Sequence, residues 1–171
     1  RSIQVVFGEG HDADGTFVRG GVAYSIDIST VTESPVEALD FMRFRLTDRR
    51  EFPLRQWGGL ELAEEMPTPG EALTIAAFIG DHEKRVDGAP GAVLGAYQQH
   101  LFHALPTDLG SSGAPLLNAQ NKVVALHQKK ATSEGMVSDD RGTRIQSKAG
   151  ILIYKIREYL EAAAARQKHT Y

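Results

Sequence analysis

The chain has 171 residues, of which 42% are hydrophobic and 24% are charged, and its formal net charge is −3. This composition is typical of a globular protein with a hydrophobic core and excludes a disordered chain. The small negative charge predicts no general surface for nucleic acid. No run of residues approaches the roughly 18 apolar residues that a membrane-spanning helix needs. We therefore expect neither nucleic acid nor a membrane as a partner.

Short runs rich in Val, Ile, Leu and Tyr follow one another along the chain, with Pro and Gly between them. This spacing predicts an all-β barrel. The expected strands are residues 3–7, 18–28, 39–46, 72–79, 93–97, 116–117, 123–127 and 150–153. One helix is expected over residues 154–168, where apolar residues recur at three- and four-residue steps. The acidic residues 61–65, followed by two prolines, predict a surface loop between two halves of the chain.

The sequence TDLGSSGAPLLNAQNKVVALH, residues 107–127, carries the strongest functional signal. An attacking serine needs a tight turn whose backbone N–H groups also face the developing oxyanion, and glycine permits both. Gly110 and Gly113 relieve the turn, Ser112 is the candidate nucleophile, and Ser111 is a spacer. The amides of Gly110 and Ser112 are the candidate oxyanion hole. The residues that follow predict a hairpin beneath the nucleophile.

This stretch resembles the nucleophile region of chymotrypsin-like serine peptidases, and is most similar to bacterial trypsin-like and glutamyl-endopeptidase-like domains. The segment VTESPVEALDFMRFRL resembles the family's aspartate segment, which implies that Asp40 is the triad carboxylate. The resemblance implies a double β-barrel with a C-terminal helix, and it implies a serine endopeptidase without metal or organic cofactor. The remainder of the first barrel would occupy residues 1–66, and the second barrel with the nucleophile residues 67–171.

The catalytic histidine of this family precedes the aspartate in the chain, and only His11 does so here. Its acidic, glycine-rich surroundings predict a solvated turn. We therefore expect the chain to start after the base histidine, with a separate N-terminal segment or chain supplying it. A compressed first barrel that uses His11 is the alternative. His100 and His103 are expected on an exposed strand face before the nucleophile, and neither HDAD nor HLFH supplies three metal ligands.

Thr107 and His127 occupy offsets from Ser112 that are similar to the specificity pocket of glutamyl endopeptidases. A buried carboxylate is costly unless donors hydrogen-bond it, which hydroxyl and imidazole groups can do. Lys129 and Lys130 would add positive potential. The sequence thus predicts a peptide substrate with Glu before the cleaved bond, although His127 could equally be a structural histidine at a strand end.

A non-catalytic binding module that keeps the peptidase fold is the second functional hypothesis, and the lack of a clear base histidine favours it. The chain contains no cysteine. A disulfide-free composition is more typical of cytoplasmic than of secreted proteins. The first residues, RSIQVVFGEG, also lack the layout of a signal peptide. A cytoplasmic location is the expectation that follows.

Overall fold

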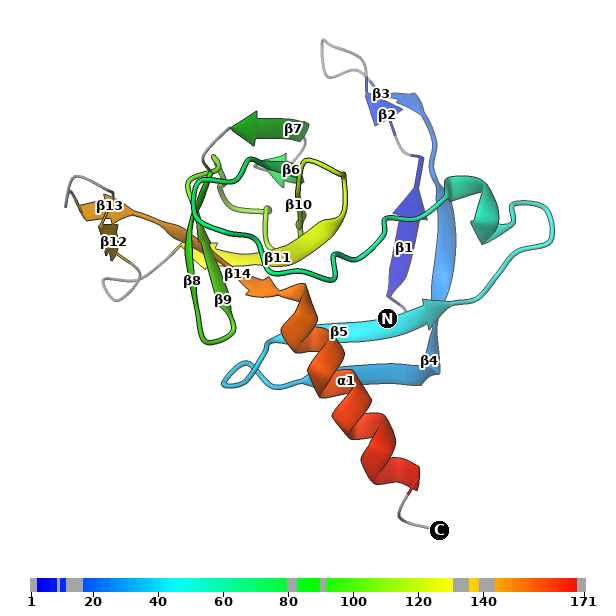
Figure 1. The fold of residues 1–171 in the computed structure, drawn as a ribbon. Helices are drawn as coiled ribbons and strands as arrows, with labels where there is room; N and C mark the ends of the chain where they lie inside the picture. Colours follow the sequence, from blue (N-terminus) through cyan, green and yellow to red (C-terminus); the bar gives the residue numbers. More distant parts are fainter. Residues whose placement is uncertain are drawn as a thin grey trace. The chain divides into compact units, whose positions relative to one another are not determined.

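The computed structural model describes residues 3–8, 10–11, 17–79, 83–89, 92–130, 136–138 and 144–168. The chain divides into two compact units, Arg1–Gly59 and Leu60–Tyr171 (Figure 1). The acidic stretch 61–65, expected as a loop between the halves, begins the second unit. There the backbone of Ala63 donates to Val123, and Val123 in turn donates to Glu61. This segment is therefore fastened to the second unit.

The first unit contains a three-stranded antiparallel sheet and a separate two-stranded ribbon. The sheet has the order β1-β4-β5, and β2 pairs with β3. The elements are β1 (Gln4–Phe7), β2 (Gly10–His11), β3 (Phe17–Arg19), β4 (Val22–Ser34), β5 (Phe41–Leu46) and the short 3-10 helix η1 (Leu54–Trp57).

An aromatic cluster holds η1 against this sheet. The hydroxyl of the buried Tyr24 donates to the carbonyl of Phe52, and it accepts from Nε1 of Trp57 at 2.7 Å. Phe7 stacks on Trp57 and meets Tyr24 edge to face. The cluster satisfies the polar ends of both Tyr24, which is buried, and Trp57, which is half-buried.

The second unit is built on a seven-stranded antiparallel sheet with the order β7-β6-β10-β11-β14-β9-β8. A two-stranded ribbon, β12-β13, and one helix complete the unit. Its elements are β6 (Leu73–Ile79), β7 (Glu83–Ala89), β8 (Val93–Tyr97), β9 (His100–His103), β10 (Pro115–Leu117), β11 (Val123–Lys130), β12 (Met136–Ser138), β13 (Arg144–Gln146), β14 (Lys148–Leu152) and α1 (Ile153–Lys168).

The seven-stranded sheet curls into a half-barrel (Figure 1). Gly70, just before β6, donates to the carbonyl of Val93, and Val93 donates back to Glu71. These two bonds join the segment that enters β6 to the start of β8, at the far side of the sheet. Helix α1 contacts β11 and β14, and its residues Ile153 and Ile156 are buried.

The expected mostly-β architecture with a C-terminal helix is confirmed. Strand β7 was not expected, because its sequence EKRVDGA is charged and contains a glycine. It lies at the edge of the sheet and pairs only with β6. Edge strands commonly carry charged residues, which discourage pairing with other chains.

Candidate functional site

The turn before β10 is held by Ser111, which is fully buried. Its hydroxyl accepts from the backbone N–H of Asp108 at 3.2 Å, and its own N–H donates to the Asp108 carbonyl at 3.1 Å. The N–H of Ala114 donates to the Ser111 carbonyl. Ser111 is therefore the anchor of the loop, whereas the sequence suggested only a spacer.

Ser112 is exposed at the tip of this turn, between two glycines that have positive φ angles. Gly110 has φ 93° and Gly113 has φ 85°, a region that residues with side chains rarely adopt. The N–H groups of Gly110 and Ser112 donate no hydrogen bond within the part of the chain that the structure describes. Both amides are therefore available to a ligand. The Ser112 hydroxyl donates to the carbonyl of Gln128 at 3.1 Å.

The turn is fastened to β11 beside it. Gly113 donates its N–H to the carbonyl of His127 at 2.7 Å, and His127 donates its N–H to the carbonyl of Ala114 at 2.8 Å. Two backbone hydrogen bonds thus join the turn that presents Ser112 to the strand that carries His127.

The side chain of His127 is buried, with only 4% of its surface exposed. Its Nδ1 lies 3.1 Å from Nε2 of His103, which is fully buried, and the two rings meet edge to face. The expectation of an exposed face for His103 was wrong. On a strand, residues three apart point to opposite faces, so the spacing of His100 and His103 puts one of them toward the core.

The two histidines belong to a polar end of an otherwise apolar sheet face. In the strand register, His127 pairs with Gly150 on β14, and His103 pairs with Lys148. Positions 148 and 150 of β14 lie on the same face of the sheet, which brings the three polar residues together. The neighbouring core positions on this face are Ile75, Leu101, Leu116, Ala125 and Leu152, all buried.

Burial and positive charge keep both imidazoles neutral near pH 7. Burial, with further contributions from His127 and the Lys148 ammonium, lowers the pKa of His103 to about 3. Burial, followed by the Lys148 charge, lowers the pKa of His127 to about 4. The ammonium of Lys148 is itself held by the carbonyl of Leu105 at 2.9 Å. Sequence reasoning missed Lys148, which precedes the buried run of β14.

Thr107 lies in the segment between β9 and the Ser112 turn, and its side chain is half-buried. Its hydroxyl oxygen is buried and has no hydrogen-bond partner within the described structure. It therefore makes no hydrogen bond to His127. A buried hydroxyl without a partner costs free energy, and a ligand that hydrogen-bonds it recovers that cost.

Asp40 lies in the first unit, directly before β5, at the end of a turn that starts at Pro35. Its backbone N–H donates to the Pro35 carbonyl at 3.0 Å, and its φ angle is 48°. Aspartate tolerates this left-handed region better than most residues do. Asp40 therefore directly precedes strand β5, but its side chain is exposed, whereas the family resemblance implied a buried carboxylate.

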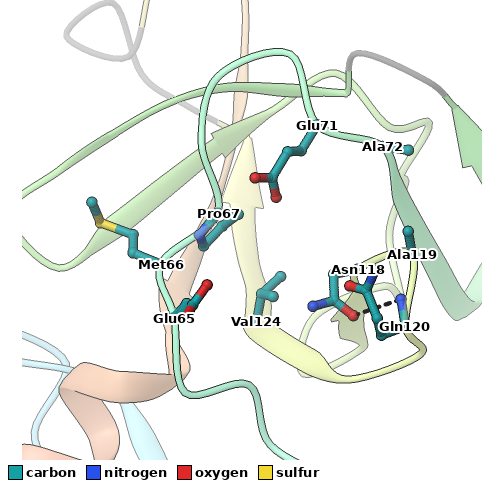
Figure 2. A pocket seen from close by; sticks show the side chains of 9 residues that line it. All are labelled: Glu65, Met66, Pro67, Glu71, Ala72, Asn118, Ala119, Gln120 and Val124. Atoms are coloured by element: carbon teal, nitrogen blue, oxygen red, sulfur yellow. Dashed lines mark hydrogen bonds between the residues drawn. The ribbon is translucent and has the colours of Figure 1, made fainter.

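A cavity of about 250 Å³ lies at the opposite end of β10 from Ser112. Figure 2 shows it between the segment from Glu65 to Ala72 and the turn from Asn118 to Gln120. Glu65 and Glu71 line it, so its charge opposes binding of an acidic side chain. This cavity is separate from the proposed site.

His11 has its backbone in β2, and its side chain lies outside the described residues, as do the side chains of Lys129 and Lys130. No group of three or more His, Cys, Asp or Glu that could hold a metal ion occurs among the residues with described placement. Of the described helices, none is long and apolar enough to cross a membrane.

No family model matches the chain, and no match is found among curated proteins.

Proposed function

We propose that the chain carries the nucleophile of a serine endopeptidase of the chymotrypsin-like, double-barrel type, with Ser112 as the attacking residue. The observation that supports this proposal best is the structure of the turn around Ser112. An exposed hydroxyl stands beside two backbone amides, those of Gly110 and Ser112, that donate to no described group. The buried Ser111 fixes the turn from below. Preorganised donors of this kind stabilise the oxyanion of acyl transfer.

In the proposed reaction, Oγ of Ser112 attacks the carbonyl carbon of the substrate peptide bond, and a base histidine takes the hydroxyl proton. The oxyanion accepts hydrogen bonds from the amides of Gly110 and Ser112. The intermediate collapses to the acyl-enzyme, and the histidine gives its proton to the leaving amine. Water then adds to the acyl carbon, which releases the carboxylic acid and restores the serine hydroxyl.

His103 and His127 do not supply this base, because they hydrogen-bond each other in the core. In our proposal the base comes from a further segment or chain, with His11 as the alternative, and Asp40 orients it. The role of the Ser112 hydroxyl bond to Gln128 is then to hold the nucleophile until substrate and base are present.

We propose a preference for Glu before the scissile bond. Lys148 gives the surroundings of His127 a positive charge, and no carboxylate is among the groups that shift the pKa of either buried histidine. The buried hydroxyl of Thr107 is a further donor without a partner. Such surroundings suit an anionic side chain, which needs donors and positive charge when it leaves water.

Labelling with a fluorophosphonate probe tests the nucleophile. The complete encoded protein should be modified on Ser112, as identified by mass spectrometry of its peptides. Ser112→Ala should abolish the labelling, and the matched control Ser29→Ala, which removes an exposed hydroxyl of the first unit, should not. Absence of labelling in the complete protein would exclude the nucleophile.

A panel of peptides that differ only at the residue before the cleaved bond tests the preference. Cleavage should be fastest after Glu and slower after Asp or Gln. Fastest cleavage after Arg or Lys would exclude the proposed pocket. The same panel on His11→Ala distinguishes the two sources of the base, since only a His11-dependent enzyme loses its activity.

A peptide-binding module on the same fold is the second candidate. It is favoured by one observation, that the Ser112 hydroxyl is bonded to a backbone carbonyl rather than to an imidazole. This candidate predicts that peptides with a terminal Glu bind the complete protein without being cleaved. Binding is measured by calorimetry, and Thr107→Val should weaken it.

A further inference from the structure

We infer that His103 is a positioning residue for specificity: it fixes the tautomer of His127 so that Nε2–H of His127 is a donor to the substrate side chain. This inference rests on the proposed function. His103 itself would not contact the substrate. The acceptor on the substrate would be a carboxylate, or the amide oxygen of Gln.

The starting point is the single hydrogen bond between the two rings. It joins His103 Nε2 to His127 Nδ1 over 3.1 Å, and one of these nitrogens must donate while the other accepts. Both rings are neutral near pH 7, because burial and the nearby Lys148 ammonium disfavour the charged forms. Each ring therefore carries one proton, and the direction of this bond fixes both tautomers.

The remaining nitrogen of His103 decides the direction. Its Nδ1 is buried and has no hydrogen-bond partner in the described structure. If His127 donated, His103 Nδ1 would carry a buried proton without an acceptor. If His103 donates, Nδ1 is instead an unpaired acceptor. Orphaned buried N–H donors are the rarer case in proteins.

Lys148 keeps the pair in its neutral form. Its register partner on β9 is His103, and its positive charge acts on both rings. The direction of the bond therefore follows from His103 Nδ1, the atom without a partner in the described structure. With His103 as donor, His127 Nδ1 accepts and the proton of His127 is on Nε2. That atom makes no hydrogen bond within the described part of the chain, so its donor is available.

The consequence concerns selectivity rather than chemistry. An Nε2–H donor favours an oxygen acceptor, whereas the other tautomer would present a lone pair that repels a carboxylate. Because His103 is fully buried, it acts on the substrate only through His127.

The tautomer is measured directly by long-range ¹H–¹⁵N correlation spectra of the labelled complete protein at pH 7. The His127 signals are assigned as those lost in His127→Gln. We expect protonated Nε2 and unprotonated Nδ1 on His127. A protonated Nδ1 would overturn the inference. This measurement needs no activity, so it decides the tautomer even if Ser112 is not labelled and the proposed function fails.

Two substitutions of His103 then test the effect on selectivity. His103→Gln keeps an N–H donor near the position of Nε2, and should retain the tautomer and the preference for Glu over Ala. His103→Leu removes the donor, and should lower this preference about 10- to 100-fold, the loss expected for one hydrogen bond to a charged group. The loss should appear in KM for the Glu peptide, with kcat for the Ala peptide unchanged.

His100→Gln is the matched control, because His100 lies on the same strand with its side chain only half-buried. It should leave the preference unchanged. An equal loss toward Glu and Ala peptides in His103→Leu would assign His103 a purely structural role and overturn the inference. If His103→Leu does not fold, the tautomer of the wild-type protein and the Glu preference of His103→Gln decide the question. A loss of the Glu preference in His103→Gln would contradict the inference.

Discussion

Gly113 donates its backbone N–H to the carbonyl oxygen of His127 at 2.7 Å, so the turn that presents Ser112 is tied to β11, the strand that carries one member of the buried histidine pair. The bond lies between two residues with different proposed tasks, one in the nucleophile turn and one in the specificity pocket. A change in the backbone on either side should therefore affect both.

Gly113→Ala should destabilise the second unit by about 1–2 kcal/mol, because φ is 85° here and the left-handed region is costly for a residue with Cβ. An added Cβ meets no atom within 4 Å, so the cost comes from the backbone alone. Labelling of Ser112 should slow as well. Urea unfolding measures the first effect. In the control Gly59→Ala, where the added Cβ is also in open space and φ lies outside the left-handed region, stability should be nearly unchanged.

Gly150→Ala should be destabilising for a different reason. Its Cβ would lie 2.8 Å from the carbonyl oxygen of Leu126 and 3.0 Å from Cδ1 of Leu116. Overpacking of this kind costs about 1–3 kcal/mol, because strand or side chain must shift. Thermal unfolding of the variant measures the loss. An unchanged midpoint would contradict the close packing of β14 on β11.

The adjacent serines should respond in opposite ways. Ser111→Ala removes the buried acceptor for the Asp108 N–H, and should cost about 1–3 kcal/mol of unfolding free energy. Ser112→Ala changes an exposed side chain and should stay within about 0.5 kcal/mol, while it abolishes probe labelling. Urea unfolding and probe labelling, both measured on each variant, distinguish the structural serine from the nucleophile. A large loss of stability in Ser112→Ala with loss of labelling only in Ser111→Ala would contradict this assignment.

Stability should fall as the pH is lowered from about 7 to about 4. The pKa of His103 is lowered to about 3 and that of His127 to about 4 in the folded protein, from an ordinary value of 6.5. Between these values the unfolded chain binds more protons, so unfolding takes up about two protons from this pair near pH 5. The contribution is complete above pH 6.5 and is lost on acidification. Urea unfolding at a series of pH values gives the slope, which His103→Gln should reduce by about one proton.

Asp40→Asn should lower turnover by about 10⁴-fold, the order of loss seen when a triad carboxylate is replaced by its amide. Asparagine also tolerates the positive φ at this position, so the fold should be retained. Circular dichroism checks the fold, and kcat on a Glu peptide checks the effect. Turnover within a few-fold of wild type would remove Asp40 from the proposed triad.

Much of the sheet could be predicted from sequence because its strands are short apolar runs between turn residues. Residues 93–97 became β8 as expected, and residues 72–79 contain β6. The charged edge strand β7 could not be predicted this way. Residues 18–28 were expected as one strand, but β3 ends at Arg19 and β4 continues from Val22 to Ser34.

The candidate site was predictable only where local sequence determines it. The two glycines indicated the turn around Ser112, and their positive φ angles agree with that use. The polar cluster was not predictable, because His103, His127 and Lys148 come from three strands distant in sequence. Only their pairing on adjacent strands brings the two imidazoles within 3.1 Å of each other.

The aromatic cluster of the first unit has a practical consequence. Trp57 is the single tryptophan of the chain, and it stacks on Phe7 while donating to Tyr24. Its fluorescence should therefore report on the first unit, residues 1–59, while the imidazole resonances of His103 and His127 report on the second. Because each unit has its own spectroscopic probe, thermal unfolding followed by both signals shows whether the units unfold together or one after the other.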